Sequence, residues 1–315
     1  MSLASRNCSV VIPTRGSDQS KLERAVLSAL KQFAVTVEVI VVANGPSPSP
    51  YFADSRVRVI RSDPAKRGNG ARNRGIAEAS YSWVALLDDD DWWEPEKLGK
   101  QIDWLESQGI HEGDSVIVGC QLREVSASGE TSQPLPLVDP GEILDAASYL
   151  FTRPGLRSTR PQLQTSTLLA STSLAQTVPF DEALMLHQDW DWVIRCSAHP
   201  STRILHVHEP LTMRSMEVGR SVSSTIRWSA SLKWASERLA SAGARVRGDF
   251  ALTVVAGFAA SERDINGFRA AWRWAWSNGR PSLGAIYYFM KALLRSLRQS
   301  RSIEHDEHDK TKGKK

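Results

Sequence analysis

Cysteine is scarce in this chain of 315 residues. Its three cysteines, Cys8, Cys120 and Cys196, are too scattered for a disulfide framework and lack the spacing of metal ligands. Long apolar runs are equally rare, and none approaches the roughly eighteen residues that a membrane-spanning helix needs. The first residues lead directly into a strand-like run, without the charged and apolar segments of an export leader. We therefore expect reduced thiols in a cytoplasmic protein.

Two common nucleotide-binding motifs are also missing. Neither the phosphate-binding pattern GxxxxGK followed by Ser or Thr nor the dinucleotide pattern GxGxxG follows any predicted strand. ATPase and dehydrogenase functions therefore have little support. An EF-hand calcium loop is excluded as well, because Trp92 and Trp93 occupy the positions where such a loop needs an oxygen ligand and a glycine.

The net charge of +4 conceals an uneven distribution. Residues 1–224 carry 22 basic and 27 acidic side chains, a balance of −5, whereas residues 225–315 carry 17 basic and 8 acidic side chains, a balance of +9. The basic surplus belongs to the C-terminal part, which faces either an anionic partner or solvent. Nucleic acid is not expected as that partner, because no nucleic-acid-binding module accompanies the charge.

Apolar periodicity in the N-terminal part alternates between strand and helix. Strands are predicted at Ser9–Pro13, Val37–Val42, Val57–Ile60 and Trp83–Leu87, and helices at Lys21–Phe33 and Gly70–Ala79. Such alternation predicts an α/β fold with a mostly parallel central sheet and helices on both faces. Ligands of such sheets bind beyond the carboxyl ends of the strands, so the loops that follow the strands are the expected place for a site.

The remainder of the chain has a looser pattern that becomes helical toward the C-terminus. Strands are expected at Ser115–Cys120, Gln164–Leu169 and Arg203–Val207, and helices at Pro140–Phe151, Trp190–Ala198, Ser229–Ala242, Asp249–Ser261, Ile265–Ser277 and Leu283–Leu297. The charged, non-periodic end of the chain predicts disorder. We expect a catalytic domain over residues 1–224, a helical C-terminal region over 225–299 and a disordered tail over 300–315.

Four consecutive aspartates, Asp88 to Asp91, directly follow the predicted strand Trp83–Leu87. Carboxylates gathered at the end of a strand repel one another, and a bound cation offsets that cost. A solvated acidic turn is the simpler interpretation of an acidic run, but the buried strand before this run and Trp92 and Trp93 after it favour a metal site. Ligands that are all oxygen indicate Mg²⁺ or Mn²⁺ rather than zinc.

Several segments together resemble the family 2 glycosyltransferases of the GT-A fold. The matching segments cover about the first 215 residues and are Val10–Arg15, Leu22–Gln32, Val39–Val42, Arg67–Gly75, Leu86–Trp93, Pro95–Lys97 and Gln188–Asp191. The resemblance implies a GT-A domain, here with a helical C-terminal extension, whose DxD motif, Asp88 and Asp90, engages the metal and the donor diphosphate. It implies an enzyme that moves a sugar from a nucleotide-diphosphate sugar, a UDP-sugar being favoured, to a hydroxyl of a glycan or lipid-linked acceptor in bacterial polysaccharide biosynthesis.

The predicted donor site lies in the loops after the strands. Its predicted donor-binding residues are Pro13, Thr14, Arg15, Asn44, Arg67, Asn73, Asp88 and Asp89. The segment Arg67–Gly75 opens a helix and offers backbone N–H and guanidinium groups to phosphate. Two departures from the family pattern matter. Ala43 and Asn44 replace an acidic pair, one member of which reads uracil, so the donor base stays open. Met213–Met216 lacks a late histidine, so water is expected in place of that metal ligand.

Asp189 is the predicted catalytic base. It precedes the predicted helix Trp190–Ala198, where an aspartate commonly caps the helix or interacts with its dipole. The segment resembles the family's Glu-Asp motif, whose aspartate takes the proton, with Gln188 in place of the glutamate. A single in-line displacement that uses Asp189 as base inverts the configuration at the anomeric carbon.

The C-terminal helices carry five of the eleven tryptophans and interleave Arg269 and Arg273 with aromatic residues. This mixture suits a peripheral contact with lipid headgroups at the inner face of the cell membrane, and it suits equally well a helix packed on the catalytic domain. His206 and His208 share one face of a predicted strand, a placement that is more often structural than metal-binding. A catalytically silent sugar-nucleotide-binding protein and a nucleotidyltransferase stay open as alternative functions.

Overall fold

The structure is a computed structural model that describes residues 6–153, 155–156, 159–216 and 228–312, with side chains described only as far as residue 298. The chain forms two compact units, Met1–Ala146 with Thr159–Ser221, and Ala147–Ser158 with Val222–Lys315. The sequence assigns Ala147–Ser158 to the catalytic domain, whereas the structure groups this segment with the C-terminal helices. The boundary predicted at residues 224 and 225 lies outside the described residues.

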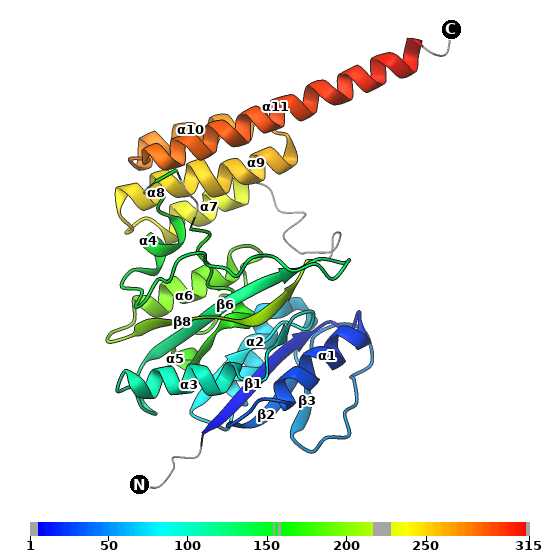
Figure 1. The fold of residues 1–315 in the computed structure, drawn as a ribbon, viewed down its shortest axis with the longest axis vertical. Helices are drawn as coiled ribbons and strands as arrows, with labels where there is room; N and C mark the ends of the chain where they lie inside the picture. The colour runs from blue at the N-terminus through cyan, green and yellow to red at the C-terminus, as the bar shows by residue number, and fades with distance from the viewer. Residues whose placement is uncertain (1–5, 154, 157–158, 217–227, 313–315) are drawn as a thin grey trace. The chain divides into compact units, whose positions relative to one another are not determined.

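The first unit is built on an eight-stranded sheet (Figure 1). Its strand order is β3 (Val57–Arg61), β2 (Thr36–Ala43), β1 (Asn7–Thr14), β4 (Trp83–Leu86), β7 (Leu169–Ser171), β6 (Val116–Val125), β8 (Arg203–Ser215) and β5 (Trp92–Trp93). The β3, β2, β1 and β4 strands are parallel, as are β6 and β8, whereas β7 and β5 run antiparallel to their neighbours. The α/β fold with a mostly parallel sheet is thus confirmed.

The central strands β1 and β4 are buried on both faces of the sheet. Successive side chains of a strand point to opposite faces. Val10 and Ile12 of β1 belong to the core that contains the apolar stripe of helix α1 (Gln19–Leu30). Val11 points to the other face, toward helix α2 (Arg67–Ala77), where a Cβ on Gly75 would lie 2.3 Å from the Val11 side chain. Gly75 therefore permits the close approach of α2 to the sheet.

Two predicted elements of the first part of the chain differ from the observed ones. The predicted strand Gln164–Leu169 is largely a 3-10 turn, η2 (Thr165–Thr167), because its side chains bind distant carboxylates and its backbone turns with them. The predicted helix Pro140–Phe151 begins only at α4 (Ala146–Phe151), since Gly141 has a φ of 59°, which a helix does not accept. Helices α3 (Lys97–Ser107) and α5 (Thr172–Thr177) were not predicted, and α6 (Gln188–Ser197) begins two residues earlier than predicted.

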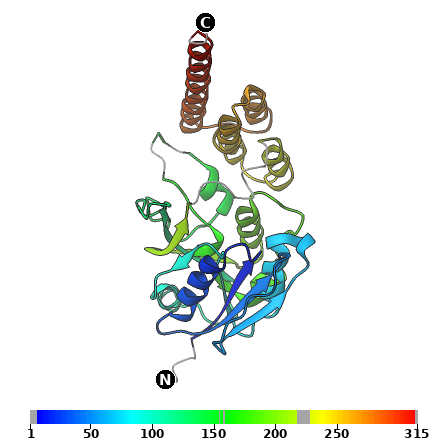
Figure 2. The same cartoon turned by 90° about the vertical axis from the view of Figure 1, so that its right-hand side faces the viewer.

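The second unit is helical. It contains α7 (Trp228–Arg238), α8 (Ala244–Phe250), the π-helical turn η4 (Ala251–Val255), α9 (Ala256–Glu262), α10 (Ile265–Asn278) and α11 (Leu283–Lys312). Figure 2 shows α7 to α10 as a group of helices packed side by side. The Asp249 carboxylate joins this group to the segment Ala147–Ser158, because it accepts bonds from Arg153 N and from the backbone and hydroxyl of Ser282.

Helix α11 extends beyond its predicted end at Leu297 and into the segment for which the sequence predicts disorder. No glycine or proline interrupts residues 285–312, so this stretch contains no strong helix breaker. Among the described residues, no helix combines the length and the apolar character that crossing a bilayer requires.

Candidate functional site

The loops after β1 and β2 lie against each other at the carboxyl edge of the sheet. The Asn44 N–H donates to the Thr14 carbonyl over 2.9 Å, and the Gly16 N–H donates to Thr14 Oγ1 over 3.0 Å. A Cβ on Gly45 would lie 1.9 Å from the Arg15 carbonyl oxygen, so a larger residue could not occupy this position without moving the backbone. These contacts place Pro13, Thr14, Arg15 and Asn44, all predicted donor ligands, along one short stretch of the edge.

Asn44 has an unusual environment in this edge. Its side chain is 5% exposed, and its Oδ1 has no hydrogen-bond partner within the described part of the chain. A buried polar atom is normally satisfied, so an unsatisfied one at the end of a strand calls for an explanation such as a ligand. The free oxygen is an acceptor, and it suits the N–H group of a nucleobase.

The first two aspartates after β4 bind different partners. Asp88 Oδ1 accepts a 2.6 Å bond from Arg72 Nη2, an ion pair in which the guanidinium is nearly buried. Asp89 Oδ2 accepts a 2.6 Å bond from Thr14 Oγ1. Burial raises the pKa of Asp89, and the Thr14 bond partly opposes this change. Asp89 therefore joins the aspartate turn to the end of β1, which is a positioning contact for the predicted donor site.

Asp91 holds the turn in place from within the protein. It is 2% exposed, and its Oδ2 accepts bonds from Ser166 Oγ over 2.6 Å and from Gln164 Nε2 over 3.1 Å. Its Oδ1 accepts a 3.0 Å bond from the N–H of Ser215 at the end of β8. Burial, followed by the charges of Asp88 and Asp90, raises the pKa of Asp91. These contacts give Asp91 a structural role that the run of four aspartates does not reveal.

Asp90 is the most exposed of the four aspartates. Its backbone oxygen accepts a 2.8 Å bond from Arg24 Nη2, which fixes the turn against α1. Desolvation by the turn, followed by the charges of Asp88 and Asp89, raises the pKa of Asp90 to about 6 although the side chain reaches solvent. Carboxylates that raise one another's pKa and face solvent are a donor set that fits a hard divalent cation.

Arg72 connects the aspartate turn to the beginning of α6. Besides its bond to Asp88, its Nη1 lies 3.2 Å from Asn69 Oδ1 and 3.5 Å from Gln188 Oε1. The whole residue is 7% exposed, so its charge acts at short range within a protein environment. Arg72 lies within the Arg67–Gly75 segment, but the sequence does not single it out as a site residue. Its burial, which distinguishes it from the exposed Arg67, cannot be read from the sequence.

Asp189 lies in the first turn of α6, but it does not cap that helix. The N-cap is His187, which has a φ of 60° and makes no side-chain capping bond. The Asp189 carboxylate instead faces Thr165, whose backbone N–H donates to Oδ2 over 3.1 Å and whose hydroxyl donates to Oδ1. Burial raises the pKa of Asp189, and the nearby Arg72 guanidinium opposes this change. The interpretation of Asp189 as a helix cap is therefore wrong. Its negative charge still lies in the first turn of α6, where the helix dipole stabilises it.

The other acidic residue of this turn, Asp191, has a different environment. It is 1% exposed, and its Oδ2 accepts a 2.7 Å bond from Arg195 Nε one helical turn later. This pairing makes Asp191 a poor alternative to Asp189 as a proton acceptor.

Two further predicted donor ligands have clear positions. Asn73 exchanges two bonds with the backbone of Phe180, its Nδ2 donating over 2.9 Å and its Oδ1 accepting over 2.8 Å. Its amide therefore attaches α2 to the loop before α6, and we assign it this structural role in place of donor binding. Arg67 is exposed at the first residue of α2, with a φ of 53° that turns the chain from η1 (Pro64–Lys66) into the helix.

The aspartate turn bound by the buried Arg72 and the aspartate at the start of α6 both lie at the carboxyl edge of the sheet. The resemblance to the GT-A glycosyltransferases predicts the donor site at this edge. Residues 9–137 match the family model described as Glycosyl transferase family 2. The N-terminal part of the chain is therefore similar to glycosyltransferase family 2.

Comparisons with individual proteins agree with this assignment. The amylovoran biosynthesis glycosyltransferase AmsB of Erwinia amylovora is 28% identical over 245 residues, which are 71% of this chain and 77% of AmsB. The UDP-Glc:alpha-D-GlcNAc-diphosphoundecaprenol beta-1,3-glucosyltransferase WfgD of Escherichia coli is 30% identical over 107 residues, 32% of this chain and 42% of WfgD. Residues 1–349 of S. aureus TarS, solved in complex with UDP-GlcNAc, share the fold with a TM-score of 0.56 and 16% identity, over 93% of this chain and 92% of that one. These relatives support a glycosyltransferase activity in glycan biosynthesis for this chain.

Proposed function

We propose that this chain transfers a sugar, with inversion, from a UDP-sugar to a hydroxyl group of a lipid-linked glycan acceptor. The observation that carries the proposal is the position of Arg72, which binds Asp88 of the aspartate turn and lies 3.5 Å from Gln188 at the start of α6. Arg72 thus connects the turn Asp88–Asp91, which resembles a donor-binding motif, to the helix start that carries Asp189, the predicted base. We infer that the two belong to one site.

The donor diphosphate would be bound at the aspartate turn. Asp88 and Asp90 would hold Mg²⁺ or Mn²⁺, whose positive charge stabilises the diphosphate as it leaves. The donor set supports such a cation, because its ligands are all oxygen and burial and mutual repulsion raise the pKa of Asp90 to about 6. Arg72 supplies a second positive charge beside Asp88.

The nucleobase would be bound at the ends of β1 and β2. The buried Asn44 Oδ1, unsatisfied within the described residues, suits the N3–H of uracil, so an amide oxygen would take the place of the carboxylate that resembling enzymes use. WfgD is named for UDP-Glc and TarS was solved with UDP-GlcNAc, which supports a uracil base here. Pro13, Thr14 and Arg15 would line the rest of the nucleotide pocket.

Asp189 would take the proton. The acceptor oxygen attacks the anomeric carbon while the bond from that carbon to the diphosphate oxygen breaks, and the hydroxyl proton moves to the Asp189 carboxylate. Thr165 holds both oxygens of this carboxylate, which fixes its orientation. Because burial raises the pKa of Asp189, the carboxylate is a stronger base than an exposed aspartate.

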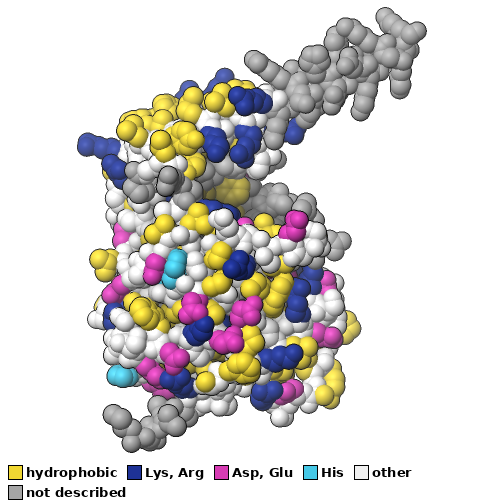
Figure 3. Space-filling model, viewed as in Figure 1, with side chains coloured by type: hydrophobic (Ala, Val, Ile, Leu, Met, Phe, Trp, Pro, Cys, Tyr) yellow, Lys and Arg dark blue, Asp and Glu magenta, His cyan; other side chains and the backbone are white. Residues whose placement is uncertain are grey.

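The helical unit supports a lipid-linked acceptor and a peripheral position at the membrane. Trp272 and Trp276 of α10 are 39% and 50% exposed, and α11 adds exposed Met290 and Leu294. Figure 3 shows mainly hydrophobic and basic side chains on the described surface of these helices. Aromatic and aliphatic side chains mixed with arginine and lysine suit an anionic headgroup layer.

Calorimetry of UDP-sugar binding with and without Mn²⁺ tests the donor site. Asp90→Ala should abolish the Mn²⁺-dependent part of the affinity and leave the melting temperature unchanged or higher, because removing one of four repelling carboxylates does not weaken the fold. Asp114→Ala, which removes an exposed aspartate elsewhere in the first unit, is the matched control. Unchanged affinity in Asp90→Ala would contradict the metal assignment. Measuring UDP release without acceptor separates a transferase from a silent binder, which releases none.

A further inference from the structure

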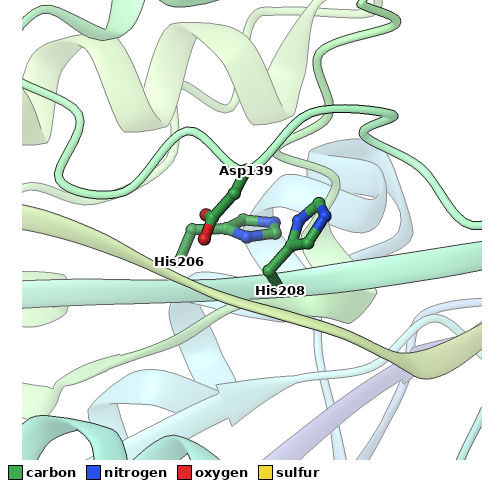
Figure 4. Close-up of side chains that lie close together, drawn as sticks. All are labelled: Asp139, His206 and His208. Carbon is green, nitrogen blue, oxygen red and sulfur yellow. The ribbon is translucent and has the colours of Figure 1, made fainter.

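Asp139, His206 and His208 form a cluster that the proposed transfer reaction does not use (Figure 4). The two histidines lie on β8 and the aspartate on the chain between β6 and α4 that passes over it, and one ligand atom from each residue lies within 4.8 Å of the other two. Ser215, which contacts the aspartate turn, is nine residues further along β8 than His206. At about 3.3 Å per residue, roughly 25–30 Å of strand separates the two places.

His206 is the unusual member of this cluster. Its side chain is 2% exposed, and neither ring nitrogen makes a hydrogen bond of good geometry among the described residues, although the Cys120 backbone lies near the ring. A neutral imidazole ring carries one N–H group and one nitrogen lone pair that can bind a metal. Buried polar groups in folded proteins are nearly always bonded to protein, water or an ion.

We propose that Asp139, His206 and His208 form a second metal site, which binds a divalent transition metal such as Zn²⁺. Two neutral imidazoles and one carboxylate are ligands that zinc accepts, with water in the fourth position, whereas Mg²⁺ and Mn²⁺ prefer oxygen. Around a tetrahedral zinc ion, ligand atoms lie about 3.4 Å apart, so the three side chains must close in slightly. Asp139 is exposed and can make that movement.

The surrounding contacts indicate that the site fixes the chain between β6 and α4 to β8. Glu142 forms a two-pronged ion pair with Arg203, at 2.8 and 2.9 Å, and the Ile143 N–H donates to the Ile204 carbonyl. Asp139 continues this series of contacts along the strand. Its Oδ1 already accepts a 3.0 Å bond from the Gly141 N–H, which orients the carboxylate and leaves the second oxygen for the metal.

Gln121 of β6 supports the same arrangement from the other side. Its Nε2 donates to the Pro136 carbonyl over 2.8 Å and lies 3.4 Å from His208 Nε2. The amide thus connects the His208 ring to the backbone three residues before Asp139. The metal would act structurally, holding this connection against the strand.

Zinc titration of the full-length chain tests the proposal. The tail histidines His305 and His308 are replaced by alanine in every sample, because they offer an adventitious site, and excess Mg²⁺ occupies the aspartate turn. The parent should bind one Zn²⁺ by calorimetry, give the visible absorption of tetrahedral Co²⁺, and melt several degrees higher with Zn²⁺ than with a chelator.

Asp139→Ala and His208→Ala should each weaken Zn²⁺ binding at least tenfold and lose the Zn²⁺-dependent rise in melting temperature. His111→Ala, at an exposed histidine outside the cluster, should behave as the parent does. Both test variants alter side chains less buried than His206, so their folding is expected to survive. Absence of Zn²⁺ binding in the parent, or undiminished binding in the two variants, would overturn the site. The site would also be overturned if Asp139→Ala lowered the melting temperature equally with zinc and with chelator, because loss of a metal-free Asp-His contact has the same effect in both conditions.

Discussion

Replacing Asp189 by asparagine separates its chemical role from its structural one. In the native chain, Thr165 donates to both carboxylate oxygens, once from its backbone N–H over 3.1 Å and once from its hydroxyl. Asparagine keeps the shape of the side chain. Its Oδ1 can accept the backbone bond, and its Nδ2 can donate to the Thr165 oxygen after the hydroxyl rotates. Both bonds therefore survive, and the change in the free energy of unfolding should stay within about 1 kcal/mol.

The loss of transfer should be much larger than the loss of stability. An amide cannot accept the acceptor's proton, and removing a general base typically lowers the rate roughly a hundredfold or more, equivalent to about 2.7 kcal/mol of transition-state stabilisation. The assay is release of nucleoside diphosphate in the presence of acceptor, together with donor affinity by calorimetry and the melting temperature. Only the first of these three should change strongly.

Asp191→Asn is the matched control, because it alters a carboxylate in the same turn of α6 that pairs with Arg195. It should lower the melting temperature, since Arg195 loses its partner, and leave turnover per folded molecule near normal. Near-normal turnover in Asp189→Asn would refute the base assignment and leave Asp189 as a group that positions η2. A melting temperature that falls as far as it does in Asp191→Asn would show that the Thr165 contacts require the charge.

Three further predictions concern the core, the nucleotide site and the helices. Burial lowers the pKa of Lys97 from 10.5 to about 8, so its protonated form costs the folded state about 3 kcal/mol at neutral pH, and stability should rise from pH 8 toward 10.5. Lys97→Met should raise the free energy of unfolding, measured in urea at pH 7, and should abolish the increase in stability between pH 8 and 10.5. An unchanged pH profile would contradict the lowered pKa of Lys97. Asn44→Ala should weaken UDP binding about tenfold, as the loss of one hydrogen bond predicts, while ADP binding stays constant. Equal losses for UDP and ADP would show that Asn44 does not recognise the nucleobase. Phosphatidylglycerol vesicles should sediment with the protein at low salt and release it at high salt, and Trp272→Ser with Trp276→Ser should weaken this binding. Equal binding to neutral vesicles, or none to either, would favour helices that pack on protein.

The first half of the sheet could be predicted because its strands are buried on both faces. Val10, Val11 and Ile12 are all 0% exposed, so the apolar run of β1 reflects two layers of helices. Helix α3 could not be predicted so easily. It begins with Lys97, which is polar in sequence but fully buried, where its ammonium lies 4.1 Å from the centre of the Trp93 ring and donates to Gln101. A pattern read from hydrophobicity counts such a lysine as exposed.

The sequence could locate the candidate site, but it could not assign a role to each aspartate. Local sequence places four aspartates after β4, yet their partners come from positions that the fold alone brings near, such as Thr14 for Asp89 and Ser166 for Asp91. The run Gln164–Leu169 illustrates the same limit. Its β-branched residues predict a strand, whereas its hydroxyl groups bind carboxylates 24 and 75 positions away, and these long-range bonds hold it as a turn.

These separate environments explain how an acidic turn is stable before a donor binds and how donor binding can act on the base. Arg72 neutralises Asp88, Thr14 binds Asp89, and the charge of Arg72 also lowers the pKa of Asp189. In the proposed reaction, a donor diphosphate would compete with Asp88 for the same guanidinium, because planar Arg donors bind phosphate and carboxylate alike. A shift of the guanidinium toward the diphosphate would take positive charge away from Asp189 and would raise its pKa. The carboxylate would then be a stronger base with the donor in place, so that proton removal would be linked to donor binding through one buried side chain.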